Sequence, residues 1–479
     1  MNRQRSWWRG SKKTIYLIAA KKIKGNMENY FNLIDQVSIG RNYNWASLNI
    51  DLNFNKQDID LESIINGSKQ FGNTQNERIF VHEYVHYLQN FYCSWGGLVF
   101  CELVLALDKM GASKVNDNII LKLPLKIKEI SDAELWNSGV KHYNKFYSLI
   151  GDIKGTTSFE KIGEYPKVVI KEISEDVIIF NNGRISFSLN GRTIREHMAE
   201  YSSLLFLNYT DEQIHQDLIN SKIHCTSNGT LEKNPEYWIL FEFFFTNNYK
   251  NVAEGLVLLC STSLSTASPN RSIIRFFKFL NDFKEELGGK DNLLNIVHGF
   301  LATPTEVIAF SFSFYATLKN ITEQLALCTK YFDHSFYKFN SIIFTQLMNN
   351  IYHDFSSKKI FDNPTLLRDK AFWVDLLNST GTPIIRYKDK TPIISTYNSD
   401  LIDALTYFFG VIKVLEDLTD SSKCNCPFHS EFKICKADYK NDELCLQEPL
   451  LVVNPVDKGK DCLYHNAIKL MGFDNRIEL

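Results

Sequence analysis

The 479-residue sequence lacks an excess of charge of either sign, since its formal net charge is −2 and no long run of Lys or Arg occurs. A chain with this balance has no basic field to attract nucleic-acid phosphates or an anionic membrane surface. Its most apolar stretches, 237–247 and 307–318, are shorter than the roughly 20 residues that a helix needs to cross a bilayer. We therefore expect a protein that binds neither nucleic acid nor membrane.

A convincing export signal is also missing. The first 13 residues are basic, but the apolar stretch 14–20 that follows has only 7 residues, at the lower limit for a secretory signal. We therefore expect a cytoplasmic protein. In that compartment the ten cysteines are expected to be reduced thiols or metal ligands rather than disulfides.

Several familiar signatures are absent as well. The sequence has no P-loop, no dinucleotide-binding fingerprint and no Ser-His-Asp order, and it shows no internal repeat or low-complexity linker. What is present is an ordinary folded composition, 44% hydrophobic and 23% charged. A chain of this length exceeds the usual size of one hydrophobic core, so two or three domains are expected.

Hydrophobic periodicity predicts an α+β protein that is predominantly helical. Every second residue of 48–54 is apolar, which is typical of a half-buried strand. Helical spacing begins at Asn76, and Gly96-Gly97 is expected to interrupt this first helix. After about residue 210 nearly every segment has helical spacing, the best candidates being 234–246, 251–264, 272–287, 305–330 and 400–418.

A second β region is predicted in the middle of the chain. Segments 167–173 and 176–180 are strand candidates, and Asn181-Asn182-Gly183 is a strong hairpin signal that leads into 184–190. The next segment, 191–207, returns to helical spacing.

The chemistry of the sequence is concentrated in residues 80–89, FVHEYVHYLQ, which contain the pattern H-E-x-x-H. Histidines four apart on a helix project from one face, so His82 and His86 can bind one Zn²⁺ at about 2.0–2.1 Å. Glu83 then lies beside the metal, where it can take a proton from zinc-bound water and return it to a leaving amine. The alternative is a surface helix that carries two solvated histidines and a glutamate.

A catalytic zinc site needs a third protein ligand and one open position. Glu196 and Glu200 are four apart in REHMAE and share a helical face. Glu196 is expected to bind zinc, while Glu200 accepts the second ring N–H of a ligand histidine. The alternative for this segment is an exposed acidic helix face. Glu254, at a predicted helix start, is the alternative third ligand, although a glutamate there also commonly caps a helix.

HEYVH followed by a helical E-x-x-A-[D/E], here EHMAE, resembles the gluzincin metallopeptidases, the clan of thermolysin. The pairing of HExxHxLQ with a later E-x-M-A helix is also similar to an uncharacterised bacterial group. The resemblance implies zinc ligation by His82, His86 and Glu196, a catalytic base at Glu83, and support of a ligand histidine by Glu200.

The sequence departs from these relatives in its spacing. His86 and Glu196 are 110 residues apart, which is long for the clan. HEYVHYLQ is also similar to the active-site helix of clostridial collagenases, but their E-E-G motif is absent here and only Glu254 partly resembles it.

Gluzincins generally place an edge β-strand beside the active-site helix, and a peptide substrate adds to that edge by main-chain hydrogen bonds. The resemblance therefore implies such an edge here, for which 46–54 and 184–190 are the candidates. Tyr201 and His197 are candidates for stabilising the oxyanion.

Half of the cysteines lie in a tail at 424–465. Cys424, Cys426, His429 and Cys435 are candidate ligands of a second, structural Zn²⁺. Their spacing matches no standard zinc finger, so reduced thiols and disulfides stay open as alternatives.

These patterns divide the chain into a β-rich N-terminal region, 1–75, a zincin-like catalytic domain, 76–270, and a helical C-terminal region, 271–479. In this prediction a small β-sheet lies beside the active-site helix. The predicted function is a zinc-dependent peptidase that cleaves a peptide or amide bond in a peptide or protein substrate. The alternative is a non-catalytic metal-binding interaction protein, although such a protein has no use for Glu83.

Overall fold

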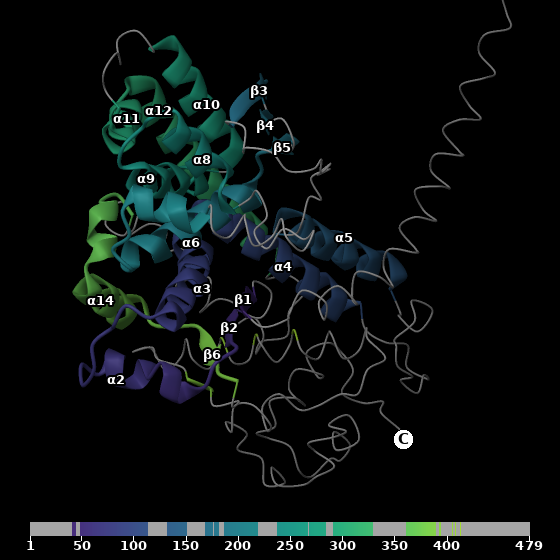
Figure 1. Cartoon of the computed structure of the whole chain (residues 1–479). Helices are drawn as coiled ribbons and strands as arrows, with labels where there is room; N and C mark the ends of the chain where they lie inside the picture. The colour runs from purple at the N-terminus through teal and green to yellow at the C-terminus, as the bar shows by residue number, and fades with distance from the viewer. Residues whose placement is uncertain are drawn as a thin grey trace, which may run out of the picture.

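The described residues form a mainly helical structure with two small β-sheets (Figure 1). This confirms the predicted α+β class in which helices predominate. The computed structural model describes residues 41–44, 48–113, 132–150, 168–175, 177–181, 186–218, 237–266, 268–283, 291–328, 361–388 and 392–393, with single residues at 405, 408 and 412.

Helix α3 (Gln75–Tyr92) lies at the centre of the fold and carries the H-E-x-x-H pattern. Its first turn is fixed by a capping box, because Thr74 Oγ1 accepts the Glu77 N–H at 3.2 Å and the Glu77 carboxylate accepts the Thr74 N–H at 2.9 Å. The helix packs against α6 (Gly191–Phe206), α4 (Ser94–Ala112) and the first sheet. Its apolar and polar faces are therefore both buried, and it is not a surface helix.

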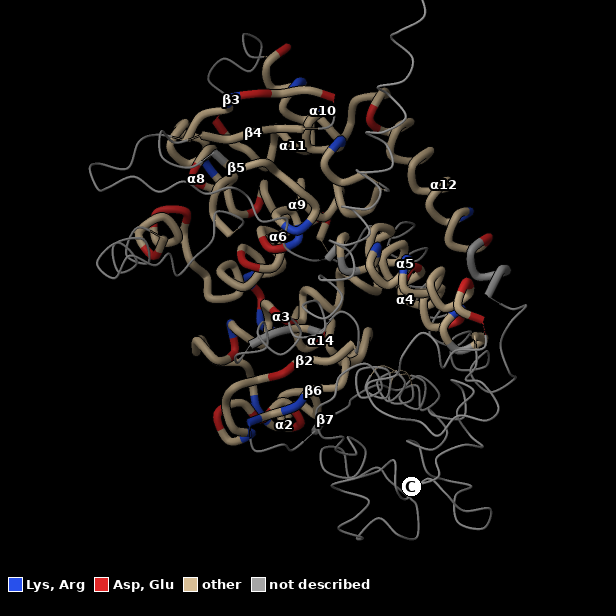
Figure 2. The backbone as a smooth tube through the Cα atoms, turned by 90° about the vertical axis from the view of Figure 1, so that its right-hand side faces the viewer, with Lys and Arg blue, Asp and Glu red and all other residues tan. Residues whose placement is uncertain are grey.

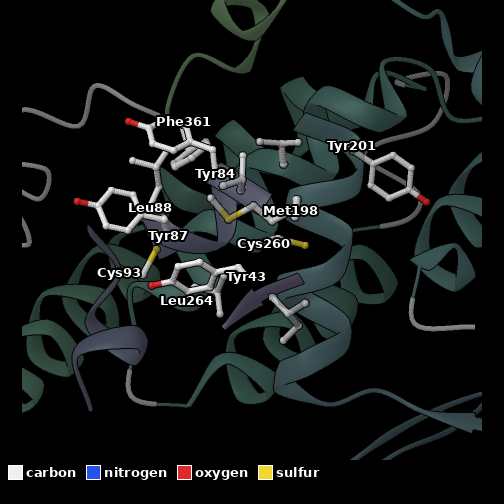
Figure 3. Close-up of a cluster of buried hydrophobic side chains, with 14 of the residues drawn as sticks. Tyr43, Tyr84, Tyr87, Leu88, Cys93, Met198, Tyr201, Cys260, Leu264 and Phe361 are labelled. Carbon is white, nitrogen blue, oxygen red and sulfur yellow. The ribbon is translucent and has the colours of Figure 1, made fainter. Parts of the chain in front are cut away.

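The core between α3, α6 and α9 (Val252–Leu264) is filled by side chains from all three helices (Figure 3). Tyr84 and Leu88 come from α3, Met198 from α6 and Cys260 from α9, and each is fully buried. This packing holds α3 and α6 together with their polar residues facing one another.

The break after α3 does not lie at Gly96-Gly97, as the sequence suggests, but at Cys93, whose backbone is extended. There α3 and α4 meet at 79°. Gly96 lies in the first turn of α4, where a Cβ atom would come within 2.2 Å of the Gln89 carbonyl oxygen. Gly96 therefore allows the start of α4 to lie close to the end of α3 at the bend, and it does not itself break the helix.

The first sheet has the strand order β1 (Arg41–Asn44), β2 (Asn49–Leu52), β6 (Ile384–Arg386), β7 (Pro392–Ile393). Strand β2 pairs antiparallel with β1 and parallel with β6. The predicted burial of the apolar residues of 48–54 is confirmed, although Asn49 between them is completely buried as well. The prediction that 46–54 forms an open edge is wrong, since β2 lies between two strands and β1 is the edge strand that contacts α3.

The same sheet joins segments that the sequence assigned to different regions. Strand β2 belongs to the predicted region 1–75 and β6 to the predicted region 271–479, and the two pair directly. The carboxylate of Asp51 accepts a hydrogen bond from Arg386 Nη2 at 2.6 Å. Within the described residues, the beginning and the end of the chain therefore share one structural layer.

The second sheet is an antiparallel meander of β3 (Val169–Ile173), β4 (Ile178–Asn181) and β5 (Ser186–Ser188). This confirms the pairing expected around Asn181-Asn182-Gly183. Phe180 packs edge-on against Phe243 and Phe277, which places this sheet beside the later helices rather than beside the H-E-x-x-H pattern.

Four of the five best helix candidates, 234–246, 251–264, 272–287 and 305–330, are confirmed, with ends that differ by five residues or fewer. Of the predicted helix 400–418, the described residues Leu405, Phe408 and Ile412 are helical and buried. The remaining elements are η1 (Lys56–Asp58), α2 (Leu61–Ile65), α5 (Ala133–Ile150), α8 (Ile239–Thr246), α10 (Pro269–Asp282), α11 (Leu293–Leu301), α12 (Pro304–Cys328), η4 (Pro364–Arg368) and α14 (Lys370–Thr380).

Charged residues of both signs are scattered along the described elements (Figure 2). Among those elements, no single helix is both long and apolar enough to cross a membrane, whereas two bent pairs, α3 with α4 and α11 with α12, reach the required length and composition together.

Candidate metal centre

Three side chains from α3 and α6 converge on one point. Ligand atoms of His82, His86 and Glu196 all lie within 4.8 Å of one another. Glu196 Oε2 is 3.6 Å from His82 Nε2 and 3.3 Å from His86 Nε2. A tetrahedral Zn²⁺ with bonds of about 2.0–2.1 Å holds neighbouring ligand atoms about 3.3 Å apart. The donor atoms therefore have the chemistry of a three-ligand zinc site, and the two distances from Glu196 are close to the separation that such a site requires.

The local sequence explains why these side chains meet. His82 and His86 lie one helical turn apart on the face of α3 that packs against α6. Helix α6 starts at Asn190, whose side chain accepts the Thr193 N–H at 3.0 Å. This cap sets the register that turns Glu196 toward the two histidines.

Glu200 lies one turn beyond Glu196 and faces the other ring nitrogen of His82. The distance from His82 Nδ1 to Glu200 Oε2 is 3.4 Å, and Glu200 Oε1 accepts a hydrogen bond from Arg78 Nη2 at 2.6 Å. A carboxylate in this position orients the imidazole so that Nε2 points at the metal position. The role of Arg78, which holds Glu200 in place, is not evident in the sequence pattern.

Gln89 makes the corresponding contact for the second histidine. The His86 Nδ1–H donates to Gln89 Oε1 at 2.9 Å, and Gln89 Nε2 donates to the Arg195 carbonyl oxygen at 2.9 Å. Gln89 is completely buried. It fixes the His86 tautomer and ties α3 to the residue before Glu196. The sequence analysis did not assign this role, although the position of Gln89 one turn after His86 is a signal that could have indicated it.

Glu83 is buried beside the two histidines and is held by the edge strand. Its Oε2 accepts the Tyr43 main-chain N–H at 2.6 Å. Tyr43 is anchored in turn, since its hydroxyl accepts a hydrogen bond from Asn90 Nδ2 at 3.1 Å. Within the described residues Glu83 Oε1 makes no hydrogen bond, and the contact at Oε2 fixes β1 next to the metal position.

The electrostatics of the cluster favour a cation. Burial by itself would lower the pKa of His82, but hydrogen bonds to Glu196 and Glu200 outweigh it and raise that pKa to about 10. Burial would also raise the pKa of Glu196, yet the charges and hydrogen bonds of the two histidines hold it well below its usual range. Burial raises the pKa of Glu83. Negatively charged carboxylates therefore surround the imidazoles, and a bound divalent cation would neutralise this charge in place of protons.

The alternative third ligand, Glu254, does not join this group. Its Oε1 accepts hydrogen bonds from Arg368 Nη2 at 2.6 Å and from Arg368 Nε at 3.0 Å. The Glu254 carboxylate, at the start of α9, is therefore already paired with the Arg368 guanidinium. Glu196 reaches the histidines instead because α6, and not α9, packs directly on the H-E-x-x-H face of α3.

The two residues considered for oxyanion stabilisation are committed elsewhere. His197 donates from Nδ1 to the Thr193 carbonyl oxygen at 2.8 Å and accepts the Leu240 N–H at Nε2, 3.1 Å away. The Tyr201 hydroxyl donates to the Tyr237 carbonyl oxygen at 2.8 Å. Neither side chain is turned toward the metal position. The ring centroid of Tyr237 lies 6.3 Å from that of His82.

The predicted structural zinc site at Cys424, Cys426, His429 and Cys435, with the whole tail 424–465, lies outside the described residues.

No model of a known protein family matches this chain, and no curated protein or solved structure matches it either.

Proposed function

We propose that this protein is a zinc-dependent metallohydrolase with a zincin-like core, and that it cleaves a peptide or amide bond. The observation that carries the proposal is the convergence of His82, His86 and Glu196 on one point with Glu83 beside them. These three side chains would hold Zn²⁺ and leave one position to water, which is the arrangement of catalytic rather than structural zinc sites.

The chain's own residues then divide the work of proton transfer and orientation. Bound Zn²⁺ would lower the pKa of its water to about 7 and polarise the scissile carbonyl. Glu83 would accept a proton from the attacking water and pass it to the leaving amine. Its raised pKa supports this role, since burial brings the carboxylate closer to the pH at which it both accepts and donates.

The edge strand supports a peptide as the substrate. Residues in an antiparallel strand direct their N–H and C=O groups to the same side, so the Tyr43 N–H that reaches Glu83 implies that the Tyr43 carbonyl also points away from β2. An extended peptide bound along β1 would donate a main-chain N–H to this carbonyl. The scissile bond would then lie over the metal position.

Zinc analysis of purified protein together with Glu83→Gln tests the proposal. We expect one Zn²⁺ per chain in wild type and in the variant, because Glu83 is not a ligand. We expect at least about a hundredfold loss of cleavage of a fluorogenic peptide library in the variant, the scale of a lost general base.

Glu62→Gln is the matched control, since Glu62 is an exposed residue of α2, and it should cleave like wild type. Protein that holds no zinc contradicts the metal assignment. Zinc-loaded protein whose cleavage rate is unchanged by Glu83→Gln contradicts the catalytic assignment and favours a metal-binding interaction protein.

A further inference from the structure

A cavity of about 420 Å³ lies where the bend between α3 and α4 meets α9, α10 and the pair α11 and α12. Its volume is in the range of small-molecule sites. None of its lining residues belongs to the candidate metal centre. Tyr92, which lines it, is six residues beyond His86, or about 9 Å along the helix axis. The cavity is therefore separate from the metal centre.

Apolar groups form the larger part of the cavity wall. Leu258 comes from α9, Leu301 from α11, Phe310 and Phe314 from α12, and Phe361 from the segment before η4. Water in such a space makes few hydrogen bonds, so a molecule with an apolar body that displaces it gains binding free energy.

Ser94 contributes a polar group to this wall, a hydroxyl that needs a hydrogen-bond partner. It is only 1% exposed, and its hydroxyl oxygen has no hydrogen-bond partner within the described part of the chain. A buried hydroxyl left without a partner costs about 1–3 kcal/mol, and such groups usually meet a ligand or an ordered water. Ser94 lines the cavity, although its hydroxyl oxygen is itself enclosed, so a rotation of the side chain toward the cavity would let an oxygen of the bound molecule supply the missing hydrogen bond.

Arg275 is the second polar group, and only part of its guanidinium is engaged. Its Nε donates to both carboxylate oxygens of Glu306, at 2.8 and 3.0 Å. Within the described residues its two Nη groups make no hydrogen bond. The hydroxyl of Thr262 donates to the Leu258 carbonyl oxygen at 2.9 Å. The Arg275 Nη groups are therefore donors that the cavity can offer to a ligand.

The charge of the cavity does not favour an anion. Glu306 neutralises Arg275, which is the one Lys or Arg among the described lining residues. We propose that this cavity binds an uncharged amphipathic small molecule, with an apolar body and a carbonyl or hydroxyl oxygen placed at Ser94 and Arg275. This inference does not depend on the proposed peptidase activity.

The outer face of α12 requires a control in any binding experiment. Ile308, Phe312 and Tyr315 are 69%, 76% and 60% exposed, and none of them lines the cavity. An apolar probe can adsorb to this face without entering the cavity. A test must therefore separate the two locations.

Titration of the zinc-loaded full-length protein with Nile red, an uncharged apolar dye with a carbonyl oxygen, makes this separation. We expect saturable binding of one dye per chain. Ser265→Trp, which fills the cavity from α9, should weaken binding about tenfold or more, equivalent to about 1.4 kcal/mol. The control Phe312→Ser should bind Nile red like wild type.

Two further measurements complete the test. In wild type, saturating Nile red should slow amide hydrogen exchange in 92–94 and 258–265, which keeps the inference testable if Ser265→Trp does not fold. Dodecan-1-ol should compete with Nile red better than dodecanoate. Non-saturable binding, unchanged exchange in both segments, or loss of binding in Phe312→Ser alone would overturn the site, and stronger competition by dodecanoate would overturn the uncharged class.

Discussion

Gln89 joins the two helices of the candidate metal centre through one side chain. Its amide oxygen accepts the His86 Nδ1–H and its amide nitrogen donates to the Arg195 carbonyl oxygen, next to Glu196. Arg78 and Glu200 make a similar chain of contacts to His82. At the scale of the residue, each histidine is therefore oriented by a partner that a metal-binding site requires and that an ordinary helix pair does not.

The Gln89 contact predicts a measurable loss of metal affinity. Gln89→Ala removes the acceptor of the His86 N–H, so the ring and its tautomer are no longer fixed, and we expect zinc affinity to fall about 10–100-fold. Competition with a chelating dye measures this change. The exposed residue Gln57 supplies the control Gln57→Ala, and equal zinc affinities of both variants would refute the role of Gln89.

Asp108 gives a second prediction at this scale, away from the metal centre. It is 2% exposed, its Oδ1 has no hydrogen-bond partner among the described residues, and burial raises its pKa to about 7 from the ordinary 3.8, against a smaller opposing effect of Lys109. Between pH 4 and pH 7 the unfolded chain ionises at this position while the folded chain does not. The contribution of Asp108 to stability is thus complete below pH 4 and is lost as pH rises to 7.

Asp108→Asn should remove this pH dependence. We expect the free energy of unfolding of the variant, relative to wild type, to increase by up to about 4 kcal/mol between pH 4 and pH 8, since each pKa unit corresponds to about 1.4 kcal/mol. Urea unfolding across this range measures the difference. Asp282→Asn, at an exposed position of α10, should show no such trend, and a flat difference for Asp108→Asn would contradict the prediction.

At the scale of the element, helix α3 carries the candidate metal ligands on one face and residues of the hydrophobic core on the others. Its length is set by the capping box at Thr74 and Glu77 and by the bend at Cys93. The edge strand β1 lies against it, so that a main-chain N–H of the sheet reaches Glu83. The catalytic glutamate of the proposed mechanism is therefore positioned by strand pairing as well as by the helix.

The bend behind α3 predicts the effect of a small substitution. In Gly96→Ala the new Cβ would approach the Gln89 carbonyl oxygen to 2.2 Å and the Asn90 Cα to 2.7 Å, both backbone atoms that cannot simply rotate away. We expect a loss of about 1–3 kcal/mol in unfolding free energy. Because the end of α3 must shift, zinc affinity should fall too.

Gly299→Ala is the control for this experiment. A Cβ at Gly299, in α11, would meet nothing within 4 Å, and alanine is the better helix former by about 1 kcal/mol. The control should therefore unfold at the same or a higher urea concentration than wild type. A Gly96→Ala protein as stable as this control would show that the bend tolerates the extra atom.

At the scale of the whole molecule, segment 361–388 connects the separate parts of the fold. Arg368 pairs with Glu254 on α9, the Tyr84 hydroxyl of α3 donates to the Gly381 carbonyl oxygen at 2.8 Å, and β6 pairs with β2. Regions far apart in the sequence thus stabilise the same centre. A metal that links α3 and α6 would add to this network.

Removal of the metal should therefore lower the stability of the whole described fold. Binding that is specific to the folded state adds about 4 kcal/mol when free zinc is a thousandfold above its dissociation constant. We expect a lower Tm after chelation and recovery with Zn²⁺, measured by circular dichroism. Glu196→Gln should show a much smaller difference with and without zinc, and an unchanged Tm of demonstrably metal-free wild type would contradict the link.

The sequence predicted those features that depend on short-range spacing. The four-residue spacing of His82 and His86 places both rings on one helix face whatever surrounds them. The alternation in 48–54 predicts that its apolar side chains are buried, and the hairpin signal at Asn181-Asn182-Gly183 predicts a local strand pairing. By contrast, the edge position of β1 could not be predicted, because it depends on a strand more than 300 residues later in the chain.

The amino-acid sequence by itself determined the helical and β segments. It also determined the pair of imidazoles with a glutamate between them. Both features depend on dihedral preferences and side-chain periodicity over a few residues. The choice of Glu196 over Glu254, the contacts of Arg78 and Gln89, and the hydrogen bond from Tyr43 to Glu83 were decided only by the tertiary structure. Each of these contacts joins elements that are distant in the sequence, and the packing of α3, α6 and the first sheet is what brings them within hydrogen-bonding distance.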